Sequence, residues 1–332
     1  MKRLLVTGPS QSEFAEAPMP ECGLDQLLVR ATVTTISTGT EIRVYRNIPV
    51  DDDGEWLHGG VAWEMPTENG YSMVGVVEEV GRDVTGFSVG ERVFVPETHK
   101  QYAAVAAERA VKIPDGIPDE QAVFIAILQV AHNALRTADP TPGDNVAVVG
   151  QGVIGLAATA YCNAFGNRTV ALDVDPDRRA MALEMGAGLA VSPMDDGFED
   201  AVRGYFNGDG ADVAIEAASV WPAIQTSLDL IRKGGRVVVV ARHTDMPAFN
   251  LVGHPYLMER ITLMTSRGFD SPGGRWDYDR SVRLTLDLMT EGRINIEPMI
   301  THRLGWQELP DAYARLGKGD GSLIGVVLRW SD

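Results

Sequence analysis

The stretch that decides the fold is residues 145–166, NVAVVGQGVIGLAATAYCNAFG. An apolar strand candidate runs into three glycines spaced G-x-G-x-x-G, and a helix-like segment follows directly. In such a turn, Gly150 lets the chain leave the strand sharply, Gly152 lets a phosphate approach the backbone, and Gly155 lets the helix pack close to the sheet. Since a helix start also offers free N–H groups to an anion, the pattern predicts a dinucleotide site.

An acid follows the glycines at the separation that a ribose contact requires. The next strand candidate, TVALDV, carries Asp173, which lies 173 - 155 = 18 residues beyond the last glycine and matches the acid expected about 20 residues on. A carboxylate here accepts hydrogen bonds from the ribose hydroxyls and repels a 2′-phosphate, which favours NAD over NADP. Arg178 and Arg179 could lie along the adenine edge or pair with Asp173. The predicted cofactor contacts, including the ends of two later strands, are Gly150, Gly152, Val153, Ile154, Gly155, Asp173, Arg178, Ala217 and Ala241.

The rest of the sequence predicts two domains that differ in their secondary structure. Apolar strand candidates alternate with helical segments after residue 119, namely VAVVG, TVALDV, LAVS, ADVAIEA, RVVVVA and ITLMTS, as in a doubly wound parallel sheet. Residues 1–118 instead read as short β runs between Gly and Pro turns, and MITHRL and IGVVLRW return to that style. We predict an α/β fold with a β-rich domain at 1–118, completed by 270–332, and a Rossmann domain at 119–269.

Composition excludes several classes of protein. The 332 residues suffice for two buried cores, and the net charge of -17 disfavours nucleic acid and anionic membranes as partners. The longest apolar run, AVFIAIL, is far too short to span a bilayer. Only two cysteines, Cys22 and Cys162, are present, without metal or redox spacing. We therefore expect a cytoplasmic protein that acts on a small molecule.

Three further segments carry a family resemblance that spans nearly the whole chain. TISTGTEIRVY, GYSMVGVVEEVGRDVTGFSVGERV and AERAVKIPDGIPDEQAVF resemble motifs of the medium-chain dehydrogenase/reductase superfamily, which includes zinc alcohol dehydrogenases and quinone oxidoreductases. The resemblance implies a GroES-like catalytic domain beside the Rossmann domain. STGTE and the GY that begins the second motif are similar to the branch that includes bacteriochlorophyllide hydroxyethyl dehydrogenases.

The metal positions of that family are altered here. Where zinc-dependent members carry their ligands, this chain has Thr38, Tyr71 and Ala126, and Ser72 replaces the glutamate of the His-Glu pair. None is a usual zinc ligand. The four-cysteine structural zinc lobe also has no counterpart, because only PETHKQ joins RVFV to QYAAV. We therefore predict a zinc-independent protein.

Without a metal, hydrogen-bond donors must serve the oxygen at which charge develops. The resemblance assigns Thr40 to the proton-relay position, and Glu41 to an acid that could orient the loop from Thr38 to Thr40. Tyr71 either directs its phenol at the substrate or fills the space left by the metal. His132 is a third catalytic candidate because histidine titrates near neutrality, with helix packing as the alternative.

Four residues are candidate substrate contacts. Thr38 lies in the same motif as Thr40, and Arg43 either meets substrate or a cofactor phosphate or is a solvated residue at a strand edge. Trp56 and Trp63, in the loop DDDGEWLHGGVAWEMP, could line a substrate pocket or anchor the loop. Two other histidines, His99 and His302, are expected to be structural or solvated.

The predicted function is NAD(H)-dependent interconversion of a secondary alcohol and a ketone without zinc. The alternative within enzymes is reduction of a conjugated carbon–carbon double bond, as in enone and quinone reductases. A protein that binds the nucleotide without catalysis is a third interpretation. The resemblance also implies a homodimer or homotetramer in which the edge strand ITLMTSRG pairs with a second copy.

Overall fold

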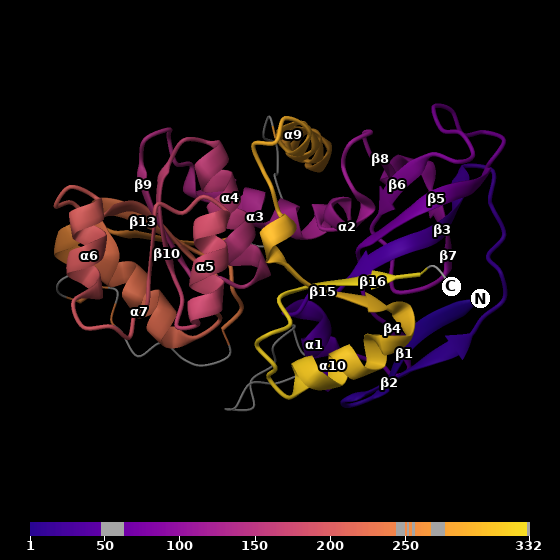
Figure 1. Ribbon diagram of the computed structural model, residues 1–332, viewed down its shortest axis with the longest axis horizontal. Helices are drawn as coiled ribbons and strands as arrows, with labels where there is room; N and C mark the ends of the chain where they lie inside the picture. Colours follow the sequence, from indigo (N-terminus) through magenta and orange to yellow (C-terminus); the bar gives the residue numbers. More distant parts are fainter. Residues whose placement is uncertain (48–62, 244–249, 251, 254–255, 267–275, 331–332) are drawn as a thin grey trace. The chain divides into compact units, whose positions relative to one another are not determined.

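The computed structural model describes residues 1–47, 63–243, 250, 252–253, 256–266 and 276–330. The chain divides into two compact units, which are Met1–Ala126 with Ile300–Asp332 (unit 1) and Ile127–Met299 (unit 2). Figure 1 shows both units and labels many of their helices and strands. Trp56, one of the candidate substrate contacts, lies outside the described residues.

Unit 1 is built on β-strands. Its seven-stranded sheet has the order β15-β16-β3-β5-β6-β8, and β7 also pairs with β3. The strands of this sheet are β3 (Gln26–Thr35), β5 (Met73–Val80), β6 (Arg92–Val95), β7 (Tyr102–Ala106), β8 (Val111–Lys112), β15 (Ile300–Gly305) and β16 (Gly325–Arg329). A three-stranded sheet has the order β2-β1-β4 and consists of β1 (Lys2–Gly8), β2 (Gln11–Glu16) and β4 (Thr67–Glu68). The predicted β-rich domain is confirmed.

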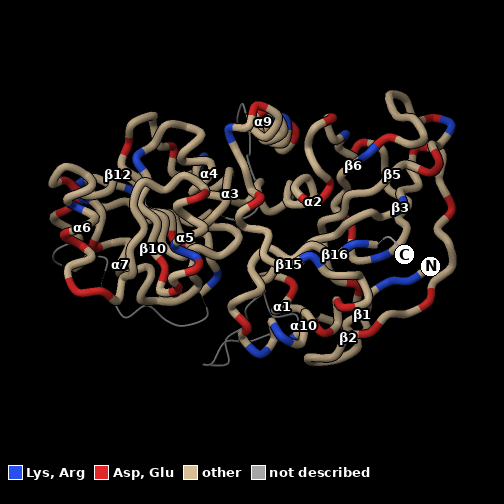
Figure 2. The backbone as a smooth tube through the Cα atoms, viewed as in Figure 1, with Lys and Arg blue, Asp and Glu red and all other residues tan. Residues whose placement is uncertain are grey.

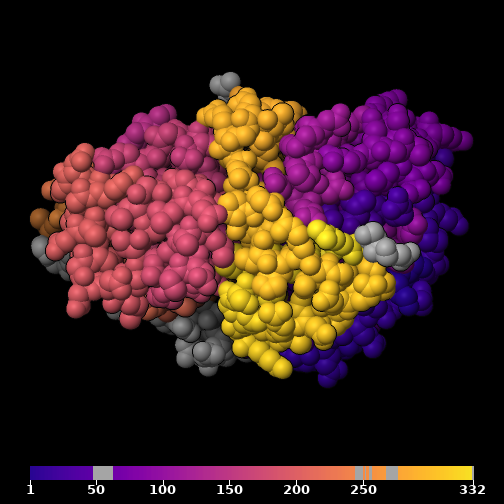
Figure 3. Space-filling model, viewed as in Figure 1, coloured from indigo at the N-terminus to yellow at the C-terminus, as the bar shows by residue number. Residues whose placement is uncertain are grey.

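The end of the chain completes unit 1, as the sequence predicts for its last strands. β16 runs antiparallel to β3, with Leu328 opposite Thr34. Figure 3 shows the yellow surface of these last residues beside the violet surface of earlier ones. Helix α10 packs against α1, where the rings of Tyr313 and Tyr45 lie 5.4 Å apart. The helical segments of the unit are α1 (Thr40–Arg46), α2 (Asp119–Ala122), α10 (Leu309–Gly317), η1 (Ala107–Arg109) and η3 (Trp306–Glu308).

Unit 2 is a doubly wound parallel sheet, as predicted. The strand order is β11-β10-β9-β12-β13-β14, and each neighbouring pair is parallel. Each of the six predicted strands is present: β9 (Asn145–Val149), β10 (Arg168–Leu172), β11 (Leu189–Val191), β12 (Ala211–Glu216), β13 (Ile231–Val239) and β14 (Thr262–Thr265). The order reverses between β9 and β12, so ligands are expected beyond the carboxyl ends of these strands.

Helices cover the parallel sheet and bury its apolar side chains. They are α3 (Ile125–Ala138), α4 (Val153–Ala164), α5 (Pro176–Glu184), α6 (Phe198–Tyr205), α7 (Trp221–Leu230), α8 (Tyr256–Glu259) and α9 (Tyr278–Thr290), and η2 (Glu297–Met299) follows them. One core cluster joins strands to α6 and α7 through fully buried residues such as Val170, Ala214, Phe206 and Leu228.

The observed division differs from the predicted one in two places: residues 119–126 belong to unit 1, and α9 belongs to unit 2 rather than completing the first domain. The reason is a set of polar pairs on its buried face. Thr285 receives a hydrogen bond from Gln129 of α3 at 3.0 Å and is bonded to the Tyr161 hydroxyl of α4 at 2.6 Å. Ser281 also donates to the Gln129 side chain. The helical pattern of residues 277–292 reveals a helix but not these partners.

No helix within the described ranges is long and apolar enough to cross a membrane. Lys and Arg positions alternate with Asp and Glu positions along both units in the view of Figure 2. The excess of acidic residues behind the net charge of -17 is therefore spread along the chain rather than confined to one segment.

Candidate functional site

The glycine turn, residues Gly150–Gly155, joins β9 to α4. Gly150 has a φ of +91°, and a Cβ there would lie 2.7 Å from the Cα of Ala218. A Cβ on Gly155 would overlap the carbonyl oxygen of Gly150. Both positions therefore require glycine for steric reasons, as the sequence predicts.

Gly152 has a different role from the other two glycines. It is the N-cap of α4, and a Cβ there would meet no protein atom within 4 Å. The first helical N–H of α4 that bonds back is that of Leu156, to the Gly152 carbonyl, so Val153 and Ile154 lie in the first turn. No acidic side chain occupies this turn. The helix start thus combines open space with N–H groups suited to a phosphate.

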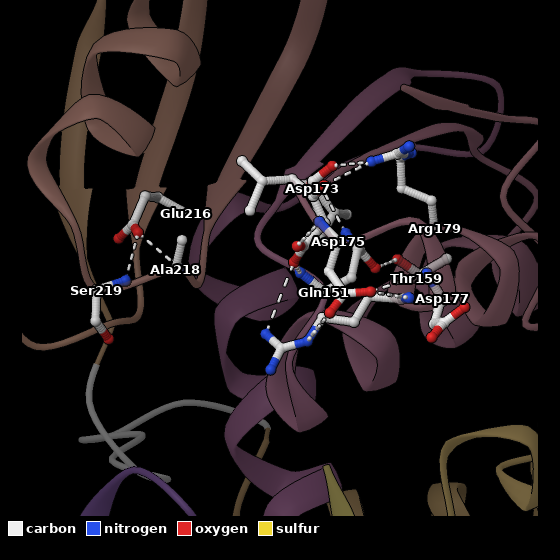
Figure 4. Close-up of polar contacts among 12 residues, drawn as sticks. Gln151, Thr159, Asp173, Asp175, Asp177, Arg179, Glu216, Ala218 and Ser219 are labelled. Atoms are coloured by element: carbon white, nitrogen blue, oxygen red, sulfur yellow. Dashed lines mark hydrogen bonds and ion pairs between the residues drawn. The ribbon is translucent and has the colours of Figure 1, made fainter. Parts of the chain in front are cut away.

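Asp173 follows β10 directly and lies beside the glycine turn (Figure 4). Its Oδ2 accepts the backbone N–H of Gln151 at 2.6 Å, and its Oδ1 accepts that of Asp175 at 2.9 Å. A carboxylate oxygen has a second lone pair, so both oxygens can still accept a hydroxyl hydrogen bond. The carboxylate is thereby held at the edge of the turn with acceptor capacity left for a ribose.

Gln151 is a residue of this site that sequence reasoning missed. Its side chain is fully buried, donates to the Val148 carbonyl at 2.8 Å and accepts from the Thr159 hydroxyl at 3.1 Å. These bonds fix the backbone N–H that meets Asp173. A polar residue between two glycines of the motif is the one sequence signal for it.

The two arginines after Asp173 behave differently. Arg179 donates from Nη1 to the carbonyls of Asp173 and Val174, each at 2.9 Å, and so supports the backbone (Figure 4). Arg178 approaches the Asp173 carboxylate at 4.0 Å and the Asp175 carboxylate at 4.0 Å. Of the two alternatives for these arginines, pairing with Asp173 is present as the contact of Arg178 at 4.0 Å.

A buried acid organises the ends of β12 and β13. Glu216 accepts the N–H groups of Ala218 and Ser219 at 2.7 and 3.0 Å through one oxygen, and its other oxygen lies 2.8 Å from Nε2 of His243. Ala217 and Ala241, both predicted cofactor contacts, are tied to the same strand ends, because their N–H groups bond to Val149 and Glu216. The sequence analysis missed Glu216 and His243.

His132 lies inside unit 2 and is surrounded by rings. Its Nδ1 bonds to Ser281 Oγ, and its ring packs against Tyr161, Phe165 and Trp276. Burial, with a further contribution from the Arg136 charge, lowers the pKa of His132 to about 4. An imidazole that stays neutral and enclosed is poorly suited to proton transfer near neutral pH, so these contacts favour the helix-packing interpretation.

In unit 1 the predicted residues Tyr71 and Thr40 lie together. The Tyr71 hydroxyl donates to Ser37 Oγ at 2.6 Å and also interacts with the Thr40 side chain. Burial, together with the nearby Glu41 charge, raises the pKa of Tyr71 to about 12. The phenol therefore keeps its proton at neutral pH, and the exposed Thr40 lies at the start of α1. Ser37 is a further residue that sequence reasoning missed.

Behind this pair lies a buried polar group that includes His99. Glu41, His99 and Tyr313 meet there, and each is almost fully buried. We call Ser37, Thr40, Glu41, Tyr71, His99 and Tyr313 the Tyr71 cluster. His99 is thus structural, one of the two expected alternatives, whereas His302 is half-buried on β15 and bonds to Thr301.

The family's ligand positions do not offer a metal its usual donors. Thr38 and Tyr71 present hydroxyls, Ala126 presents none, and Ser72 donates its hydroxyl to the Val123 carbonyl. Zinc in proteins is held by thiolate, imidazole or carboxylate groups. Across the described ranges, no group of three or more His, Cys, Asp or Glu side chains is placed to hold a metal ion. The donor set therefore does not fit zinc.

The remaining substrate candidates are placed as follows. Arg43 lies within helix α1, so the alternative of a solvated strand-edge residue is wrong. The helix forms because Ile42 and Tyr45, three residues apart, both pack into the core of unit 1. Thr38 is half-buried just before α1, and Trp63, the first residue of the described range 63–243, is also half-buried.

Two family models match the chain, one in each part. "Alcohol dehydrogenase GroES-like domain" matches residues 23–115, and "Zinc-binding dehydrogenase" matches residues 153–285. Among curated proteins, the L-threonine 3-dehydrogenase of Shewanella frigidimarina is 30% identical over 99% of this chain and 100% of its own. The sorbitol dehydrogenase of Halalkalibacterium halodurans is 25% identical, over 96% and 97%.

Solved structures share the whole fold. A short chain alcohol dehydrogenase from Escherichia coli, complexed with NADH, has a TM-score of 0.82 at 21% identity and covers 99% of both chains. A chain from Sinorhizobium meliloti bound to NADP has a TM-score of 0.82 at 20% identity, again over 99% of both chains. The two relatives carry different nicotinamide cofactors, so the likeness in fold does not distinguish NAD from NADP.

Proposed function

The chain belongs to the medium-chain dehydrogenase/reductase superfamily, among the zinc-type alcohol dehydrogenase-like proteins, and from this premise we propose that it interconverts a secondary alcohol and a ketone with NAD(H) and without zinc. Its relatives include L-threonine, sorbitol and butanediol dehydrogenases, which supports an oxidoreductase that acts on alcohols. The substrate is a small organic molecule.

One observation carries the metal-free part of this proposal. The Tyr71 phenol lies at a position where zinc-dependent relatives carry a metal ligand, and it is hydrogen-bonded within a turn of hydroxyl side chains. Because its pKa of about 12 keeps it protonated, Tyr71 can turn its one hydroxyl hydrogen from Ser37 Oγ to the oxygen that gains charge during ketone reduction. The Ser37 hydroxyl can then donate to the phenol oxygen in return. Thr40, exposed beside it, can donate and accept and so exchange the proton with solvent.

The cofactor would be held by the glycine turn and Asp173. The open side of Gly152 and the first turn of α4 suit the pyrophosphate, and the free lone pairs of Asp173 suit the ribose hydroxyls. When bound, NAD(H) supplies or takes up the hydride. The fixed Asp173 carboxylate would repel a 2′-phosphate, which is why we propose NAD rather than NADP.

The first test is a paired assay of cofactors and substrates. NADH and NADPH are each offered with a panel of ketones and a panel of enones, and oxidation of the cofactor is followed at 340 nm. We expect turnover of ketones with NADH. Oxidation of NADH by enones alone would instead support the double-bond reductase, and NADH binding without turnover of any panel member would support a nucleotide-binding protein without catalysis.

The second test concerns the metal. The purified protein is assayed before and after dialysis against a strong chelator, and its zinc content is measured in parallel. We expect activity to be unchanged and zinc to be substoichiometric. A zinc-containing alcohol dehydrogenase treated in the same way provides the control, since it must lose activity. Loss of activity that returns with added Zn²⁺ would refute the zinc-independent assignment.

We also propose a homodimer formed through the edge of the parallel sheet. β14 is the last strand of that sheet, and nearby Val252, Leu257 and Met258 are exposed apolar side chains. A strand edge that pairs with no other strand of the described residues, and that is flanked by apolar side chains, is suited to pair with a second copy. Light scattering coupled to size exclusion should give twice the mass of one chain, and a monomer would refute the proposal.

A further inference from the structure

The Glu41 carboxylate is buried within unit 1, with an exposed fraction of 1%. Its Oε1 accepts the Ser37 backbone N–H at 2.8 Å. Its Oε2 accepts the Tyr313 hydroxyl at 2.5 Å and lies 2.9 Å from Nε2 of His99. A buried carboxylate is stable only when donors surround it, and here three segments of the chain supply them.

A series of hydrogen bonds joins Trp330, Thr34, His99 and Glu41. The Trp330 indole can only donate, and it donates to Thr34 Oγ1 at 3.0 Å. Because the Glu41 carboxylate can only accept, Nε2 of His99 donates to it at 2.9 Å, and Nδ1 on the other side of the ring lies 2.8 Å from the Thr34 hydroxyl. The side chains of Trp330, Thr34, His99 and Glu41 are thus joined by hydrogen bonds, and a satisfied buried network holds its members in one arrangement.

The same group is connected to Tyr71 at both ends of that residue. At the hydroxyl end, Ser37 accepts from Tyr71 through Oγ while its N–H is held by Glu41. At the backbone end, the His99 N–H bonds to the Asn69 carbonyl, and the Asn69 side chain donates to the Glu41 carbonyl, each at 3.0 Å. His99 also packs against Gly70, where a Cβ would lie 2.7 Å from its ring.

We propose that His99 and Tyr313 are positioning residues for the reaction, because they hold Glu41, which holds Ser37, which directs the Tyr71 hydroxyl. This inference rests on the proposed function, in which Tyr71 serves the substrate oxygen. Neither residue belongs to the motifs that carry the family resemblance, and Tyr313 lies 272 residues from Glu41 in sequence. A small displacement of a donor lowers the rate strongly without weakening cofactor binding.

The test is a double-mutant cycle between Tyr71 and Tyr313. We expect Tyr313→Phe to lower kcat about tenfold while leaving the KM for NADH unchanged. If Tyr313 acts through Tyr71, the double variant Tyr71→Phe/Tyr313→Phe will show the kcat of Tyr71→Phe alone. An unchanged kcat in Tyr313→Phe, or effects that multiply in the double variant, would overturn the inference.

Tyr45→Phe is the matched control. Tyr45 packs against Tyr313, and Tyr45→Phe also removes one hydroxyl bond, a partly buried one to the Ser10 carbonyl at 2.8 Å, but Tyr45 has no bond to Glu41. Its kcat should stay within about twofold of the parent. A fall equal to that of Tyr313→Phe would show that any lost hydroxyl in this core slows the enzyme, and would overturn the inference.

A second pair of variants protects the test against misfolding. His99→Gln keeps an N–H donor for Glu41 and should retain more kcat than His99→Leu, with both compared at equal NADH binding. Equal losses in the two would count against positioning by hydrogen bonds. The proposed function fails separately, because it is Tyr71→Phe alone that must lower kcat for the assignment of the reacting donor to stand.

Discussion

The glycine turn of unit 2 and the Tyr71 cluster of unit 1 are built in opposite ways. In the glycine turn, contacts of the backbone fix the geometry: two positions require glycine because of close contacts, and two backbone N–H groups hold Asp173. In the Tyr71 cluster, side chains from distant segments hold one another, and Glu41 alone gathers donors from three segments. A site made from local backbone can be recognised in sequence, whereas a site made from long-range side-chain contacts cannot.

The largest expected effect is a loss of kcat on changing the Tyr71 cluster, with no change in NADH binding at the glycine turn. Removal of one oxygen in Tyr71→Phe should lower kcat for ketone reduction about 10²–10³-fold, because the donor to the developing charge is lost. The Kd for NADH, measured by fluorescence titration, should stay within about twofold because the glycine turn is untouched. A kcat close to the parent value would show that another group serves the oxygen.

The next effect compares two glycines of the turn. Gly155→Ala should destabilise the protein by about 3 kcal/mol, because its Cβ overlaps the Gly150 carbonyl. Gly152→Ala should cost less than about 1 kcal/mol, since its Cβ meets no protein atom, yet it should raise the Kd for NADH about tenfold or more. Urea unfolding and NADH titration separate the two. Equal stability losses would mean that the two glycines do not have distinct roles.

His132 provides a test outside both sites. Its pKa of about 4 in the folded chain lies below the usual 6.5 because of burial and the Arg136 charge. Between these pH values the unfolded chain binds a proton at His132 that the folded chain does not. The part of the free energy of unfolding that depends on His132 is therefore fully present above pH 6.5 and decreases as the pH falls toward 4. At pH 5 the free energy of unfolding should be about 2 kcal/mol lower than at pH 7 because of His132.

His132→Gln should remove that part of the acid sensitivity, as judged by urea unfolding at the two pH values. His302→Gln, at a half-buried histidine on β15, is the matched control for a histidine-to-glutamine change away from α3. Retention of the full acid sensitivity in His132→Gln would show that another group is responsible.

The smallest effect concerns cofactor choice. Asp173→Ser removes the carboxylate beside the turn and should lower the ratio of the NADPH Kd to the NADH Kd about tenfold. Asp177→Asn also removes one negative charge, in the first turn of α5, and should leave the ratio within about twofold. It therefore controls for the general effect of lost charge. An unchanged ratio in Asp173→Ser would break the assignment of this carboxylate to the ribose.

Local patterns predicted most of the fold. Apolar runs located all six strands of the parallel sheet, and MITHRL and IGVVLRW located β15 and β16. The errors arose where a local pattern was ambiguous. The segment from Thr40 to Arg46 has apolar residues at both strand and helix spacing, and packing of Ile42 and Tyr45 into one core makes it a helix. The helix α9 was recognised, but its polar partners in α3 and α4 decided its unit.

The sequence by itself determined the glycine turn, because glycine spacing and the acid that follows are local features whose geometry depends on nearby backbone. It also determined that the family's metal positions hold Thr38, Tyr71 and Ala126, since ligand chemistry is a property of residue type. Only the tertiary structure decided that Tyr71 meets Ser37 and that Glu41 meets His99 and Tyr313. Those partners lie 34, 58 and 272 residues apart, and no local pattern encodes contacts over such separations.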